Sequence, residues 1–177
     1  GNDVLQGGDG DDHLDGGAGN DYLDGGPGND TLTDDGGNDT LLGGDGSTLS
    51  GGAGQDVCRI GAINPASLHG DQITDFIAGP GGDVLDLADL LQYSLATGEL
   101  AAGANPFLTQ YLHIVGSGAD IVLQLDRDGP AGPAGWVSVL RLLNLDGRSF
   151  TAANILQGWN PFGSTGLSPL GADGNNS

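Results

Sequence analysis

The amino-acid sequence predicts an all-β protein whose N-terminal third winds as a flattened helix and whose remainder forms further strands. Residues 7–33 repeat one nonapeptide three times, as GGDGDDHLD, GGAGNDYLD and GGPGNDTLT. Glycine accounts for 36 of the 177 residues, and this content favours a succession of tight turns. After Arg59 glycine becomes rarer and apolar residues alternate with polar ones, which is typical of half-buried strands.

Each nonapeptide divides into a glycine-rich hexapeptide and a three-residue segment centred on a leucine. Six residues suit a turn, in which glycine takes backbone angles that other residues resist, and three residues suit a short strand. Every hexapeptide exposes backbone carbonyls and ends in an aspartate. Calcium binds about six to eight such oxygens, and one turn offers about half of them. We therefore expect each ion to lie between two stacked turns.

With two nonapeptides per coil, alternate turns stack along the same edge, about 4.8 Å apart. The aspartates at the sixth position of the repeat, which we predict to be calcium ligands, then form two columns. One column contains Asp3, Asp21, Asp39 and Asp56, and the other contains Asp12 and Asp30 followed by a gap. The gap arises because the fifth repeat, residues 43–50, is one residue short and lacks this aspartate. A calcium site there is expected to be weak or absent.

The charge of the chain also favours a cation as its partner. The formal net charge is −20, and Glu99 is the one acidic residue that is not an aspartate. The chain contains no lysine and only four arginines, so nucleic acid and anionic membranes are not expected partners. The sequence shows no signal peptide at its start and no apolar run long enough for membrane insertion.

The first 59 residues contain thirteen aspartates and no cation before Arg59. Carboxylates about 5 Å apart repel by roughly 1 kcal/mol in water, and ordering many glycines costs further free energy. We therefore expect this region to be disordered without calcium and to fold cooperatively as about four or five ions bind. Modules of this kind bind calcium at about 0.1 to 1 mM, which favours a secreted, extracellular location.

The nonapeptide pattern GGxGxDxUx, in which U is a large aliphatic residue, resembles the calcium-binding repeat of RTX proteins. The resemblance implies a right-handed parallel β-roll with a C-terminal β-rich capping domain. It also implies that backbone carbonyls complete the calcium sites, here those of Gly8, Gly10, Gly17, Gly19, Gly26 and Gly28. Because the chain begins at the fourth position of a nonapeptide, we expect it to be a piece of a longer protein.

A second resemblance covers roughly residues 68–157. The segments 71–76, 82–91, 111–114, 121–126 and 154–157 are similar to the type I secretion C-terminal target domain of large bacterial RTX adhesins. This resemblance implies an uncleaved C-terminal signal, which an ATP-binding-cassette transporter of the type I secretion machinery reads as it exports the unfolded chain. Residues 158–162 and the polar tail after them depart from the short apolar end expected of that domain.

We divide the chain into the repeat array at residues 1–59, a β-rich capping and secretion domain at residues 60–160 and a flexible tail at residues 161–177. A short helix is predicted at Thr151–Gln157, capped by Ser149 or Thr151. Turns are predicted at residues 79–82, 116–118 and 126–135. Strands are predicted at Leu68–Ile77, Asp83–Leu91, Tyr111–Val115, Ala119–Leu125 and Trp136–Leu145.

Several residues have both a structural and a functional interpretation. Cys58 occupies the leucine position of the sixth repeat, which favours a buried small hydrophobe over a reactive thiol. Asp126–Gly129 starts like a calcium loop, but no glutamate follows at the required distance, so a hairpin turn is favoured. Strand alternation explains Asp71, Asp75, Asp83, Asp86 and Asp89 more simply than an extra ion site does. Four further aspartates lie off the repeat register and are expected to be solvated, namely Asp9, Asp15, Asp24 and Asp45.

No motif predicts catalysis or an organic cofactor. His13, His69 and His113 are scattered outside any HExxH motif, no GxSxG motif occurs, and a Walker-type nucleotide site would need a lysine. The sequence favours a calcium-dependent folding module that carries the C-terminal type I secretion signal of an extracellular bacterial RTX adhesin, which regions N-terminal to this chain could retain at the cell surface. The alternatives are the non-catalytic secretion and folding region of a secreted RTX hydrolase or toxin, and a calcium-assembled surface layer.

Overall fold

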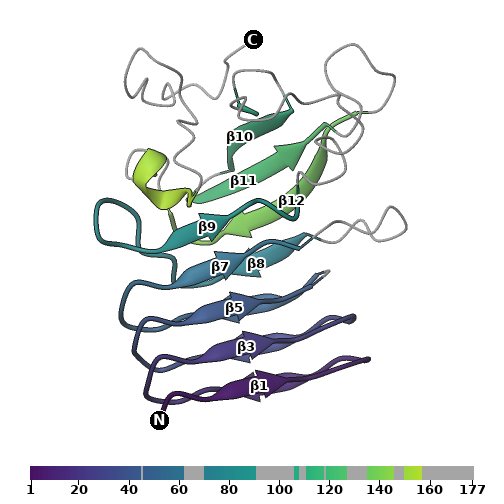
Figure 1. Cartoon of the computed structure of the whole chain (residues 1–177). Helices are drawn as coiled ribbons and strands as arrows, with labels where there is room; N and C mark the ends of the chain where they lie inside the picture. Colours follow the sequence, from purple (N-terminus) through teal and green to yellow (C-terminus); the bar gives the residue numbers. More distant parts are fainter. Residues whose placement is uncertain are drawn as a thin grey trace.

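The computed structural model describes residues 1–44, 46–61, 70–90, 106–107, 111–117, 119–126, 135–145 and 150–156. The nonapeptides form a roll in which each three-residue segment is a strand and each hexapeptide a turn (Figure 1). These strands are β1 (Val4–Gln6), β2 (His13–Asp15), β3 (Tyr22–Asp24), β4 (Thr31–Thr33), β5 (Thr40–Leu42), β6 (Thr48–Ser50) and β7 (Val57–Arg59).

Successive strands alternate between two sheets, so that one coil of the roll contains two nonapeptides, as the repeat predicts. The five-stranded sheet has the order β1-β3-β5-β7-β9 and is parallel throughout. The seven-stranded sheet has the order β10-β11-β12-β8-β6-β4-β2. The predicted all-β fold class, a parallel β-roll with a β-rich C-terminal cap, is confirmed.

The aliphatic position of the repeat fills the space between the two sheets. In the five-stranded sheet this position pairs in register from Leu23 through Leu41 to Cys58. In the other sheet it pairs from Leu14 through Leu32 to Leu49. Each of these side chains is at most 6% exposed. A buried leucine contributes about 1.5 to 3 kcal/mol, so this double column is the apolar core of the roll.

Both sheets continue past residue 59, where the sequence analysis placed the end of the repeat array. Strand β8 (Asp71–Ile73) pairs in parallel with β6, and β9 (Val84–Asp86) pairs in parallel with β7. The predicted glycine turn at residues 79–82 lies between these two strands. The N–H of Gly82 donates a hydrogen bond to the carbonyl of Gly79 at 3.1 Å. Because β8 belongs to the seven-stranded sheet and β9 to the five-stranded sheet, this turn joins two different sheets and is not a hairpin turn.

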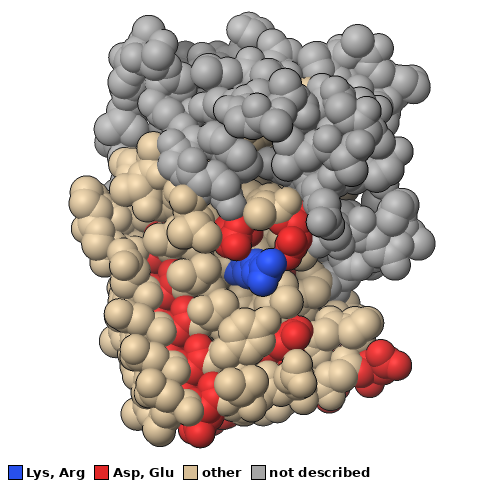
Figure 2. Space-filling view, in the orientation of Figure 1, with Lys and Arg blue, Asp and Glu red and all other residues tan. Residues whose placement is uncertain are grey.

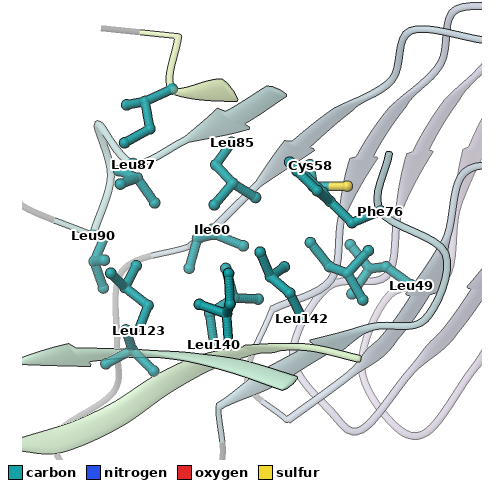
Figure 3. Close-up of a cluster of buried hydrophobic side chains, with 14 of the residues drawn as sticks. Leu49, Cys58, Ile60, Phe76, Leu85, Leu87, Leu90, Leu123, Leu140 and Leu142 are labelled. Carbon is teal, nitrogen blue, oxygen red and sulfur yellow. The ribbon is translucent and has the colours of Figure 1, made fainter. Parts of the chain in front are cut away.

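Three longer strands complete the cap: β10 (Leu112–Ser117), β11 (Asp120–Leu125) and β12 (Val137–Leu142). They form an antiparallel meander, as the predicted hairpin turns require, and β12 then pairs in parallel with β8. One sheet thus runs from the roll into the cap without a break. Figure 3 shows the shared core, in which Leu49 and Cys58 from the roll lie near Leu140 and Leu142 from the cap.

The prediction of a helix at Thr151–Gln157 is wrong in type and length. The structure has a 3-10 helix, η1 (Ala152–Asn154), with Thr151 as its N-cap, and Ser149 and Gln157 lie outside the described residues. The helix stops because Ile155 is extended and forms a parallel bridge with Leu85 of β9. The strand predicted at Leu68–Ile77 is likewise shorter, and the predicted tail at residues 161–177 lies outside the described residues.

Candidate metal centre

We call the turns that lead into the five-stranded sheet the first edge of the roll. On this edge the sixth-position aspartates stack, and Oδ1 of each accepts the backbone N–H of the aspartate one coil nearer the N-terminus. Asp3 donates to Asp21 at 2.6 Å, Asp21 to Asp39 at 2.8 Å and Asp39 to Asp56 at 3.0 Å. Asp83 ends the column by accepting the N–H of Asp56 at 3.0 Å. The predicted column is present and is one aspartate longer than the repeats alone indicate.

In Asp21, Asp39 and Asp56 the second carboxylate oxygen is buried and has no hydrogen-bond partner. Asp21, Asp39 and Asp56 are each at most 3% exposed. Among the described residues, the Oδ2 atoms left without a partner belong to Asp12, Asp21, Asp30, Asp34, Asp39 and Asp56. A buried anionic oxygen without a partner is costly. A hard cation that prefers oxygen ligands fits this arrangement, and calcium is such a cation.

We call the turns that lead into β2, β4, β6 and β8 the second edge. Asp12 donates its N–H to Oδ1 of Asp30 at 2.9 Å. Asp30 then donates to the hydroxyl oxygen of Ser47 at 2.9 Å, and this hydroxyl donates to the carbonyl of Gly43 at 2.8 Å. Ser47 thus continues the ladder but brings no carboxylate, which is the predicted gap. Asp71 resumes the column by accepting the N–H of Ser47 at 3.0 Å.

The six glycines predicted to offer carbonyl ligands all have φ between 81° and 151°, a region that disfavours other residues. Their carbonyls point along the roll toward the next coil on the same edge. A Cβ on Gly26 would collide with the carbonyl oxygen of Gly8, and one on Gly28 with that of Gly10. The carbonyl of Gly17 instead accepts the N–H of Asp35 at 3.2 Å. Only glycine therefore permits the close stacking of these turns.

Burial, and after it the crowding of carboxylates, raises the pKa of several aspartates. Burial raises the pKa of Asp34 from 3.8 to about 6, and the charges of Asp39 and Asp21 add to the shift. Burial likewise raises the pKa of Asp56 to about 6, with contributions from Asp83 and Asp39. Burial also raises the pKa of Asp30. The edges of the roll therefore disfavour their own full ionisation and favour a bound cation.

Asp34 belongs to a cluster of three carboxylates on the first edge, and its role was not predicted from the sequence. One carboxylate oxygen each from Asp21, Asp34 and Asp39 lie within 4.8 Å of one another, and all three side chains are buried. Asp34 stands at the first position of its nonapeptide, where the pattern has glycine. This substitution of aspartate for glycine is the sequence feature that could have indicated the role of Asp34. It is more simply interpreted as the loss of a consensus residue from the repeat.

Comparison with known proteins agrees with this geometry. Residues 1–32 match the family model of the RTX calcium-binding nonapeptide repeat. The chain carries RTX calcium-binding repeats. Two solved structures are similar to it, both subunits of the mannuronan C5-epimerase from Azotobacter vinelandii. The AlgE6R2 subunit has 27% sequence identity and a TM-score of 0.54, covering 88% of this chain and 91% of its own. The AlgE6R3 subunit has 27% identity and a TM-score of 0.52, covering 96% and 89%. No curated protein matches the sequence.

Three aspartates after the RTX repeats act as hydrogen-bond acceptors for the last turns. Asp75 accepts from the N–H of Gly52 at 2.8 Å and from the hydroxyl of Ser50 at 2.7 Å. Asp83 accepts from Asp56 through Oδ1 and from the N–H of Ile77 through Oδ2 at 2.6 Å. Asp71, described above, is the third. The predicted explanation, alternation on half-buried strands, is wrong for these three: Asp71 and Asp83 are buried, and Asp75 and Asp83 lie outside β8 and β9. Each instead terminates a stack of RTX turns.

The other two aspartates of this group belong to an ion pair. Nε of Arg59 lies 2.9 Å from a carboxylate oxygen of Asp89 and 3.8 Å from one of Asp86. Figure 2 shows a basic patch between acidic residues on the face of the roll, beside the acidic stripe that follows one edge. The ion pair lies where β7 meets β9, so it joins the last RTX strand to the cap.

The remaining candidates do not form a second metal cluster in the described part of the chain. Asp9 and Asp15 are exposed and Asp24 is half-buried, whereas Asp45 lies outside the described residues. His13 and His113 are exposed and far apart in the fold, on β2 and β10, while His69 and residues 127–134 are not described. Cys58 is 2% exposed, and burial raises the pKa of its thiol, so the structural interpretation of Cys58 holds. No helix of the described residues is long and apolar enough to cross a membrane.

Proposed function

We propose that this chain is a calcium-dependent folding module. The observation that carries the proposal is the set of buried Oδ2 atoms without partners at both edges of the roll. Calcium ions between stacked turns would bind these oxygens together with glycine carbonyls such as those of Gly8 and Gly10. We assign the ligand role to the sixth-position aspartates and expect about four or five ions.

Calcium would decide whether the roll folds at all. The raised pKa values of Asp34 and Asp56 support this, because burial and neighbouring charges make their ionised forms unfavourable in the coil stack. An ion that binds only the folded form contributes about 1.4 kcal/mol at ten times its dissociation constant. Several ions acting on one continuous pair of sheets then give a cooperative transition. Because such modules bind at about 0.1 to 1 mM, the chain would stay unfolded inside a cell and fold outside it.

This behaviour suits export through a type I secretion machinery, for which the resemblance of residues 68–157 is the support. An ATP-binding-cassette transporter would carry the unfolded chain, and calcium outside the cell would fold it. Folding at the exit would also oppose movement back into the transporter. The cap would start folding, since β8, β9 and η1 close the last coil of the roll.

Two parent proteins remain candidates, and different observations favour them. The likeness of the cap to the target domain of bacterial adhesins favours an adhesin held at the cell surface. The structural similarity to two subunits of an epimerase favours attachment to a secreted enzyme, in which this module would be a non-catalytic part. Sequencing upstream of Gly1 separates them: tandem domains of about 100 residues indicate an adhesin, and a catalytic domain indicates an enzyme.

Far-UV circular dichroism during a calcium titration tests the folding proposal. We expect a cooperative change from coil to β-rich signal near millimolar calcium, with magnesium at the same concentration as the control. Magnesium should fail because it requires a smaller octahedral site and loses its water reluctantly. A β-rich spectrum in excess chelator at neutral pH would contradict the proposal, because the roll would then fold without the ion.

A further inference from the structure

The three-carboxylate cluster of Asp21, Asp34 and Asp39 differs from every other pair of stacked turns in the described roll. On the first edge, the turns that contain Asp21 and Asp56 bring one carboxylate each to the stack, and residues 74–83 bring Asp75 and Asp83, whose oxygens all accept hydrogen bonds. Here the turn of residues 34–39 brings two, one from its first position and one from its sixth. All three side chains are at most 3% exposed, and Oδ2 of each has no hydrogen-bond partner.

The three carboxylates are held in place by backbone N–H groups on their other oxygen. Oδ1 of Asp21 accepts from Asp3 at 2.6 Å, and Oδ1 of Asp39 accepts from Asp21 at 2.8 Å. Oδ1 of Asp34 accepts the N–H of Asp35 at 2.9 Å. Backbone donors thus hold one oxygen of each group, and the other oxygen is buried, anionic and without a hydrogen-bond donor, an arrangement that a cation satisfies.

The carboxylate of Asp34 occupies a position that other turns fill with their own sixth-position aspartate. In the turns beginning at Gly25 and Gly51, a Cβ on the first glycine would collide with Oδ2 of Asp30 and Asp56 respectively. At Gly16 the colliding atom is Oδ2 of Asp34, which belongs to the coil above. Asp34 therefore reaches out of its own turn into the turn of residues 16–21.

We propose that Asp21, Asp34 and Asp39 form a specialised calcium site that binds the first ion and joins two coils before the remaining sites fill. The inference rests on the proposed calcium-dependent folding and adds an order of binding to it. Three carboxylates attract a divalent cation more strongly than two, and ligand charge is a main determinant of calcium affinity in oxygen sites. The site also combines ligands from residues 16–21 and 34–39, so one ion aligns two successive turns of the same edge.

Calcium binding to the full chain, measured by equilibrium dialysis with the free ion buffered, tests this proposal. Wild type should show one ion bound at least about tenfold more tightly than the rest. Asp34→Gly restores the residue of the repeat pattern, and Asp34→Asn keeps the size and an amide oxygen for the N–H of Asp35. Both variants should lose the tight ion and keep the others.

Asp35→Gly is the matched control. It removes the same charge from the adjacent glycine position of the same turn, but Asp35 is exposed and outside the cluster. It should leave the first ion unchanged. An equally tight first ion in Asp34→Asn, or a tighter one, would overturn the proposal. If wild type bound no calcium below about 10 mM, the folding proposal itself would fail, and that result is distinct from equal binding by wild type and variant.

Hydrogen exchange locates the first ion independently of its affinity. At one equivalent of calcium, the N–H of Asp21, which donates to Asp39, should gain protection before the N–H of Asp12, which donates to Asp30 on the second edge. In Asp34→Asn this order should disappear. Simultaneous protection of both edges in wild type would contradict the proposed order of binding.

Discussion

The backbone N–H of Asp39 donates to Oδ1 of Asp56 across 17 residues, at 3.0 Å. Oδ1 of Asp39 accepts the N–H of Asp21, so this one residue connects three coils through its backbone and its side chain. Asp39→Asn keeps an acceptor for the ladder but removes the anionic Oδ2. We expect the calcium midpoint of folding to rise, because each ion whose binding is lost removes about 1.4 kcal/mol of stabilisation at ten times its dissociation constant. Circular dichroism during a calcium titration measures it, and Asp15→Asn, at an exposed aspartate, should leave the midpoint unchanged.

The leucine column should determine stability once calcium is saturating. Leu41 is fully buried between the sheets, and Leu41→Ala should lower the free energy of unfolding by about 2 to 5 kcal/mol. Urea denaturation in excess calcium measures the change. Val4 is 74% exposed, so Val4→Ala should change the stability by less than about 0.5 kcal/mol. Equal effects of the two substitutions would mean that the ions alone hold the coils together.

Asn154 should couple the 3-10 helix to the end of the roll. Its side chain is fully buried, donates to the carbonyl of Asp83 at 2.8 Å and accepts the N–H of Gly79 at 3.0 Å. Asn154→Ala leaves these groups without partners and should cost about 1 to 3 kcal/mol. Hydrogen exchange should show faster exchange of the N–H of Leu156, which donates to Leu85. Asn29→Ala, at an exposed turn, is the control and should not change it.

Acidic pH should partly replace calcium. The pKa values of Asp34 and Asp56 are about 6 in the folded chain, against an ordinary value of 3.8. Between about pH 4 and pH 6 the folded state therefore binds more protons than the unfolded state, and its stability rises as the pH falls through this interval. In chelator, the β-rich circular dichroism signal should increase as the pH falls from 7 to 5. A decrease over the same interval would contradict the assignment of raised pKa values.

The single thiol provides a probe of folding without any substitution. Cys58 is 2% exposed between the sheets, and its raised pKa further slows attack on thiol reagents. A disulfide reagent should therefore label the chain in chelator at neutral pH and label it far more slowly in millimolar calcium. The same reagent in urea with calcium is the control for full access. Rapid labelling in calcium would mean that the roll opens frequently near β7.

The repeat made much of this fold predictable, because its two signals are local. The position of Leu14, Leu23 and Leu32 gave three-residue strands in register, and the spacing of the aspartates gave the two columns and the gap at Ser47. Calcium ligation by those aspartates stays a prediction. Asp34 was missed because its place in the cluster depends on its side chain reaching the turn of residues 16–21. The replacement of a glycine in the repeat does not indicate which turn the new side chain will contact.

The cap was less predictable because tertiary contacts decide it. Asp75 and Asp83 accept from turns 23 to 27 residues away, a relationship that no local pattern encodes. The strand expected at Leu68–Ile77 is short because the chain turns back after Ile73 so that Asp75 reaches Gly52. The helix expected at Thr151–Gln157 is short because Ile155 pairs with Leu85. In each case a contact distant in sequence overrides the local preference.

The ladder of aspartates gives the roll a direction of assembly. In every step on the first edge the donor is the backbone of the earlier coil and the acceptor is the side chain of the later one. In this ladder a coil thus finds its acceptors already placed only when its C-terminal neighbour has formed, and the last acceptor, Asp83, is fixed by the N–H of Ile77 within the cap. A second, exposed ladder runs the other way, because Asn20 donates its N–H to Asn2 and Asn38 donates to Asn20. In the buried ladder each coil is a template for the one before it in sequence. The cap would order the turn of residues 51–56 through hydrogen bonds, the first ion would then join the turns of residues 34–39 and 16–21, and ordering would advance toward the N-terminus while an emerging chain is still being delivered.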